Sequence, residues 1–151
     1  MKIGGITVAP CEELLVLPRT DGADIPIRAV AVAINEEFEK LVPEPIDPMI
    51  QVKGGKQADL KDKDYLAAVE RRGAQRLAFL FIKSLEPSNI EWEKVKLDEP
   101  QTWPKWEAEL WEAGLSSIET SRIIALVMVA NSLDDAKIEE ARKAFLLGQG
   151  E

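Results

Sequence analysis

The chain has 151 residues, 46% of them hydrophobic and 30% charged, which is the composition of an ordinary globular domain with a sizeable core. No apolar run approaches the roughly 20 residues that a membrane span needs, so we expect no membrane partner. The N-terminus lacks an apolar segment of signal-peptide length, and the single Cys11 cannot form an internal disulfide; both features favour the cytoplasm.

The net charge of −8 is unevenly distributed along the chain. Residues 1–58 carry −3, residues 59–97 carry +1 and residues 98–151 carry −6. An acidic C-terminal part repels phosphate, so nucleic acid is a poor candidate partner. Arg71, Arg72 and Arg76 form the main basic cluster, and their spacing is typical of a solvated helix face.

Residues 1–42 predict a small β-rich subdomain. Three runs have high strand propensity: Lys2 to Val8, Glu13 to Pro18, and Ile25 to Ala33. We expect them to form an antiparallel meander that lays one face on the helices, since three strands alone are marginal. A short helix from Asn35 to Leu41 should follow, with Phe38 pointing inward.

Residues 43–58 predict an extended connector, because three prolines within six residues are followed by Gly54-Gly55. The helical domain, residues 59–151, begins after it. Asp62 or Asp64 can cap a long helix that runs to about Leu85, and Gly73 in its middle indicates a close approach to another element.

Trp103 to Leu147 predicts three consecutive helices. The middle one opens after Gly114 with a capping box, Ser116 to Glu119, and contains eight consecutive apolar residues from Ile123 to Ala130. A helix without a polar stripe has neighbours on most sides, so we expect the flanking amphipathic helices to enclose it. The predicted fold is therefore α+β and mainly α-helical, with about four main helices and a small N-terminal antiparallel β-meander.

The chain contains no histidine, which removes the commonest general base and the commonest metal ligand. The segment from Lys53 to Lys56 lacks the spacing of a phosphate-binding loop. Paired carboxylates such as Glu36-Glu37 and Asp134-Asp135 point in different directions on a helix, so they do not converge on one substrate. We therefore expect no enzymatic activity and no cofactor or metal.

Three tryptophans lie within nine residues and share a predicted helix face with a leucine. Indole rings are enriched among residues that dominate binding energy, and one end of the ring tolerates water. Ordinary packing against the apolar helix is the alternative role. The candidate partner-binding residues are Trp103, Trp106, Leu110 and Trp111.

The order of residues from Trp106 to Leu146 resembles the C-terminal half of tail assembly chaperones of long-tailed, siphovirus-like bacteriophages. Its most marked part is Glu112-Ala113-Gly114-Leu115-Ser116 followed by Glu119, and Val16-Leu17-Pro18-Arg19 near the N-terminus is similar too. The resemblance implies a non-catalytic protein of the host bacterial cytoplasm that binds the tape-measure protein, recruits tail-tube subunits and is absent from the mature virion. It also implies self-association along a long client.

Two alternatives remain open from the sequence. One is a structural tail or adaptor component that persists in the particle, which mass spectrometry of purified particles would detect. The other is an enzyme whose metal ion is bound by carboxylates, which requires acidic residues far apart in the sequence to lie close together in the fold.

Overall fold

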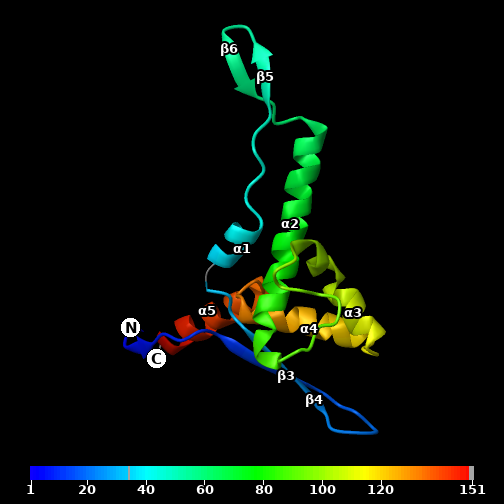
Figure 1. The fold of residues 1–151 in the computed structure, drawn as a ribbon. Helices are drawn as coiled ribbons and strands as arrows, with labels where there is room; N and C mark the ends of the chain where they lie inside the picture. Colours follow the sequence, from blue (N-terminus) through cyan, green and yellow to red (C-terminus); the bar gives the residue numbers. More distant parts are fainter. Residues whose placement is uncertain (34, 150–151) are drawn as a thin grey trace.

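A computed structural model describes residues 1–33 and 35–149 and has the predicted class, mainly helical with small antiparallel sheets. A compact base carries three extensions: an N-terminal hairpin, a long upright arm and a C-terminal helix (Figure 1). The predicted division into subdomains 1–42 and 59–151 does not follow the packing, because one core draws residues from both. No helix in the described ranges is long and apolar enough to cross a membrane.

The three N-terminal strand runs do not form one meander. Strands β1 (Lys2–Ile3) and β2 (Ile6–Thr7) pair only with each other, because Gly4 and Gly5 both take positive φ and turn the chain back at once. Strands β3 (Glu12–Leu17) and β4 (Ile25–Val30) form a separate antiparallel pair. The short helix α1 (Glu36–Leu41) follows, and its Phe38 is buried as predicted.

The predicted 43–58 connector is extended only in its first part. Strands β5 (Met49–Val52) and β6 (Gly55–Ala58) form a hairpin closed by Lys53 and Gly54, and Gly54 has a φ of 101°. Helix α2 (Lys63–Ser84) begins at Asp62, whose carboxylate accepts the amide of Tyr65 at 2.9 Å. Two 3-10 helices then follow, η1 (Glu86–Ser88) and η2 (Pro100–Lys105).

Helices α3 (Trp106–Glu112), α4 (Ser117–Ala130) and α5 (Asp135–Gln149) complete the chain. The predicted capping box is confirmed, since the Ser116 hydroxyl accepts the Glu119 amide and the Glu119 carboxylate accepts the Ser116 amide, each at 3.1 Å. Gly114, with a φ of 111°, makes the predicted turn before it. Hydrogen bonds then tie the end of α4 to α2 and to the segment after β4: Asn131 accepts the Val32 amide and donates to the Ser84 hydroxyl.

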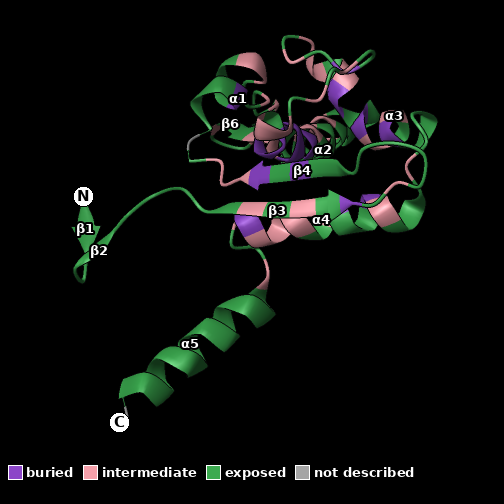
Figure 2. Cartoon of the chain, turned by 90° about the horizontal axis from the view of Figure 1, so that it is seen from below, coloured by how far each residue is buried: buried purple, intermediate pink, exposed green. Residues whose placement is uncertain are grey.

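The prediction that α3 and α5 enclose α4 is wrong for α5. Helix α4 packs instead on β3, β4 and α2, and α5 has no buried residue (Figure 2). The junction explains the difference, because Ser132 takes a left-handed φ of 57° and directs the chain away from α4. The apolar helix is therefore buried on one side only, and Ile118 on its other side is 67% exposed.

Candidate docking surface

Three of the four candidate partner-binding residues belong to the core. Trp103 is fully buried, and its indole N–H donates to the Lys96 carbonyl at 3.1 Å, so the ring needs no water. Trp106 stacks on Phe81 with ring centroids 4.8 Å apart, and Leu110 is also buried. These side chains offer no surface to a partner.

Only Trp111 among the four candidates is open to solvent, with 47% of its surface exposed. The first of the three helices predicted from Trp103 onward is divided into η2 and α3, and η2 lies against α2. Trp103 sits on η2 and packs between Phe38 and Phe79, at centroid distances of 6.1 and 5.0 Å. Trp103 and Trp106 thus pack η2 and α3 against α1 and α2.

Exposed large apolar side chains lie on the N-terminal strands, on α5 and on the upright arm. We define the arm as residues 43–77: the proline segment, the β5–β6 hairpin and the N-terminal part of α2 (Figure 1). None of its residues is buried, and Ile46 is 93% exposed. The exposed large apolar residues of the arm are Ile46, Met49, Ile50, Leu60, Leu66, Val69 and Leu77.

The arm is held upright by contacts between the proline segment and α2. Hydrogen bonding to Asp47 in the proline segment raises the pKa of the Tyr65 phenol on α2. The Asp59 amide donates to the Pro48 carbonyl at 2.7 Å and closes the base of the hairpin. Residues 49–58 therefore form a closed hairpin rather than a loose connector.

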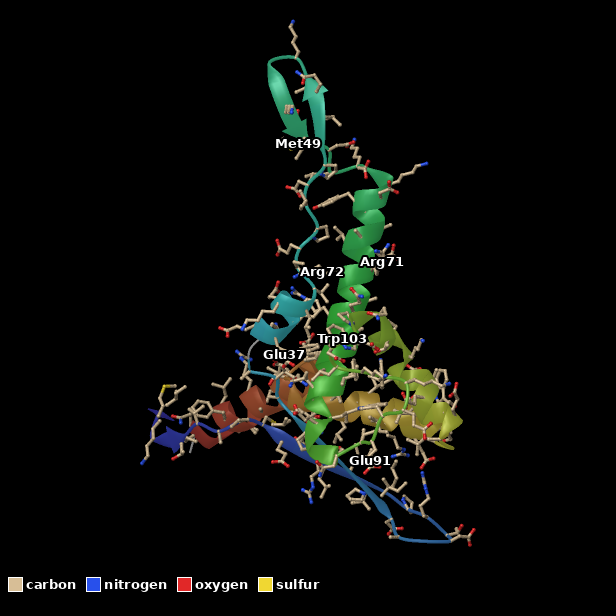
Figure 3. The ribbon with its side chains drawn as sticks, in the orientation of Figure 1. Glu37, Met49, Arg71, Arg72, Glu91 and Trp103 are labelled. Carbon is tan, nitrogen blue, oxygen red and sulfur yellow. The ribbon has the colours of Figure 1, made fainter. Side chains whose placement is uncertain are left out.

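At the root of the arm, two of the three clustered arginines have structural roles instead of forming a solvated face. The guanidinium groups of Arg72 and Arg76 both bind the Glu39 carboxylate, Arg76 at 2.9 Å. Both also lie over the Phe38 ring, at 5.0 and 5.2 Å from its centroid. Arg72 turns toward α1 and the proline segment, whereas Arg71 lies on the opposite side of α2 (Figure 3).

A groove of about 470 Å³ runs between the proline segment and α2. No atom lies within 4 Å of the position that a Cβ on Gly73 would occupy, so the predicted close approach at this glycine is absent. The groove is open and mixes carboxylates, guanidinium groups and apolar atoms. Its lining residues are Glu44, Pro45, Asp47, Tyr65, Val69, Arg72, Gly73 and Arg76.

The arm also differs from the rest of the molecule in charge. Residues 43–77 contain 7 basic and 6 acidic side chains, a net +1, whereas the remaining residues contain 12 and 21, a net −9. The projection therefore carries apolar groups without the acidic excess that limits close association elsewhere. Within the described residues, no three acidic or cysteine side chains lie close enough together to hold a metal ion.

The sequence contained a signal for this surface. Met-Ile-Gln-Val before Lys53-Gly54 has the composition of a strand followed by a turn, but the neighbouring prolines favour a connector.

In comparisons with known proteins, no family model, no curated protein and no solved structure matched the chain.

Proposed function

We propose that the protein is a non-catalytic tail assembly chaperone of a long-tailed bacteriophage, which binds the tape-measure protein and recruits tail-tube subunits. The observation that supports this most is the arm, a projection that carries seven exposed large apolar side chains and no buried residue. Several large apolar side chains exposed on one projection are typical of a site that binds another polypeptide. The resemblance of residues 106–146 to such chaperones favours the same role.

The shape of the arm suits a helical client. Leu66, Val69 and Leu77 are spaced by three and eight residues on one helix, which is the spacing that packs against a second amphipathic helix. The arm's near-neutral charge admits a client of either sign. Binding would cover apolar side chains of both proteins and keep a long helix soluble.

Co-expression with the tape-measure protein tests the proposal. We expect the two proteins to co-elute in low and moderate salt, because apolar contacts are not screened by ions. The double variant Leu66→Gln, Val69→Gln should weaken capture by at least about tenfold. Ile118→Gln is the control, since it removes an exposed apolar side chain from the base. Failure of the wild-type protein to co-elute, or equal losses in both variants, would contradict the proposal.

The proposed function also predicts where the protein is found. A chaperone works in the host bacterial cytoplasm and is absent from the finished particle, whereas a structural tail or adaptor component stays in it. Mass spectrometry of purified particles distinguishes the two. Peptides of this chain at the level of known tail proteins would favour the structural role and exclude the chaperone.

A further inference from the structure

The two edges of the β3–β4 sheet differ in how their backbone groups are paired. On the outer edge of β4, the Arg28 amide donates to the Ser88 hydroxyl at 2.8 Å, and this hydroxyl donates to the Arg28 carbonyl at 2.7 Å. The Ser84 hydroxyl donates to the Val30 carbonyl on the same edge, at 2.8 Å. Side chains of α2 and η1 therefore close this edge of the sheet.

The outer edge of β3 is open. The Ala31 amide donates to the Cys11 carbonyl at 2.9 Å, which continues the ladder and shows that the odd-numbered residues of β3 direct their amides and carbonyls toward β4. The even-numbered residues direct theirs outward, and no other part of the described chain pairs with them. These residues are Glu12, Leu14 and Val16, and all three are exposed.

Two prolines limit the length of this open edge. Pro10 and Pro18 occupy the next outward positions on either side of β3, and neither has an amide to donate. Between them, amides and carbonyls alternate along one straight strand. Only an extended backbone matches such a row, because the amides and carbonyls of a helix are already paired with each other. The open edge therefore fits a short strand.

Helix α4 argues against a second copy of β3 as this strand. It packs on the sheet and lies behind β3 in Figure 2. Two paired β3 strands are about 4.8 Å apart, so a two-fold axis between them would bring the two α4 helices closer than the roughly 8–10 Å that helix packing needs. A single added strand avoids this clash, and side chains on one of its faces lie over α4. The half-buried apolar residues of α4 include Ile124, Leu126 and Met128.

The charges beside the open edge differ between its two ends. Glu12 and Glu13 lie at the N-terminal end, and Glu12 is 3.9 Å from Arg28. At the other end, Arg19 is already paired with Glu119 at 2.6 Å. An antiparallel strand, which is the more stable arrangement, brings its C-terminal end beside the two adjacent carboxylates. A lysine or arginine at that end is therefore complementary in charge.

We propose that the open edge of β3 binds an extended segment of another polypeptide, which joins the sheet as an antiparallel strand. The segment spans about five residues, has apolar side chains at the alternate positions that face α4, and carries a basic residue at its C-terminal end. Hydrogen bonds to the backbone of Glu12, Leu14 and Val16 fix its register. This site lies on the base, is separate from the arm and does not depend on the proposed function.

Titration of the full-length protein with a defined peptide tests the proposal. The probe contains three Thr-Val repeats followed by lysine, and fluorescence anisotropy of a label at its N-terminus measures binding. With the valine side chains over α4, the threonine amides face β3. Methylation of the threonine amide nitrogens should abolish binding, whereas methylation of the valine amides should leave the dissociation constant within about threefold. Equal effects of the two modifications overturn the proposal, and so does no binding of the unmodified peptide up to about 1 mM.

A proline on β3 tests the same contact from the side of the protein. Leu14→Pro removes one outward amide, and the ladder to β4 does not use this amide. The variant should fail to bind the peptide, because the proline ring occupies the place of the incoming carbonyl. Leu14→Thr is the matched control, since it keeps the amide and should bind within about fivefold of the wild-type protein. Circular dichroism checks that both variants are folded, and wild-type affinity in a folded Leu14→Pro would exclude this edge.

Hydrogen exchange followed by NMR locates the contact without any substitution. In the free protein, the amides of Glu12, Leu14 and Val16 should exchange rapidly, and those of Glu13 and Leu15, which face β4, slowly. Saturating peptide should slow the first group by at least about tenfold and leave the second unchanged. Rapid exchange of the first group in the complex contradicts the proposal. Protection of this group in the protein alone, lost on dilution, would identify a second copy as the occupant and would also overturn it.

Discussion

Both ends of α2 carry large apolar side chains, but their surroundings differ. The C-terminal part presents Phe79, Phe81 and Ile82 to the core, and all three are buried. Leu66 and Val69 in the N-terminal part lie outside this buried arc of the helix and are exposed on the arm. The difference arises from what lies beside the helix, because α1 and η2 cover its lower part and only the proline segment accompanies its upper part (Figure 1).

An apolar stripe therefore predicts which side of a helix becomes covered, but it does not show whether the covering residues belong to the same chain. In α2 both outcomes occur on one helix. The lower part is held by its own fold, and the upper part is available to another molecule. Substitutions along α2 and around its lower end can test this contrast.

The largest effect is expected at Phe79. This ring packs on Phe38 and Trp103, with centroids at 5.6 and 5.0 Å, so Phe79→Ala leaves a cavity beside two aromatic side chains. We expect a loss of about 3–5 kcal/mol in the free energy of unfolding, measured by urea titration. Leu66→Ala on the arm is the matched control and should cost less than about 1 kcal/mol. Equal losses would show that the arm packs as tightly as the base.

A smaller effect is expected at Asn131, which joins three elements of the base. Its side chain accepts the Val32 amide at 2.9 Å and donates to Ser84 and to the Val127 carbonyl, at 3.1 and 2.8 Å. Asn131→Ala leaves these groups unpaired and should cost about 1–3 kcal/mol in thermal or urea unfolding. Ser121→Ala on the exposed side of α4 serves as control, with a change within about 0.5 kcal/mol.

The next effect depends on pH. Hydrogen bonds from Arg19 and from the Ser116 amide lower the pKa of Glu119 below its usual 4.5. The folded state therefore binds this proton less tightly than the unfolded state does. The stabilisation is complete above the unfolded pKa and is lost as pH falls through the folded pKa.

Glu119→Gln should consequently be less stable than the wild-type protein near neutral pH, and the gap in unfolding free energy should narrow between about pH 5 and pH 3. Urea unfolding at a series of pH values measures it. Glu70→Gln, on the exposed side of α2, gives the baseline for removal of one negative charge. A gap that stays constant with pH would show that the ion pair with Arg19 does not form in solution.

Local features of the fold could be predicted from the sequence, because their causes lie within a few residues. The capping box of Ser116 and Glu119, the turn at Gly114 and the start of α2 at Asp62 are of this kind. The burial of Trp103 could not, because it depends on η2 and on rings from α1 and α2. The exposure of α5 could not be predicted either. Its apolar stripe predicts packing against another helix, but the left-handed conformation of Ser132 directs α5 away from α4.

The smallest effect on stability is expected from the arm itself. Leu66→Gln together with Val69→Gln replaces two exposed side chains with a good helix former, so the free energy of unfolding should change by less than about 1 kcal/mol in total. Urea unfolding followed by tryptophan fluorescence reports on the base, where Trp103 and Trp106 lie, and circular dichroism at 222 nm also includes the helical part of the arm. If both signals give the wild-type midpoint while capture of the client is lost, the arm contributes to binding and not to folding. A loss above about 2 kcal/mol would instead mean that these side chains are covered within the free protein, and the contrast between the two ends of α2 would not hold.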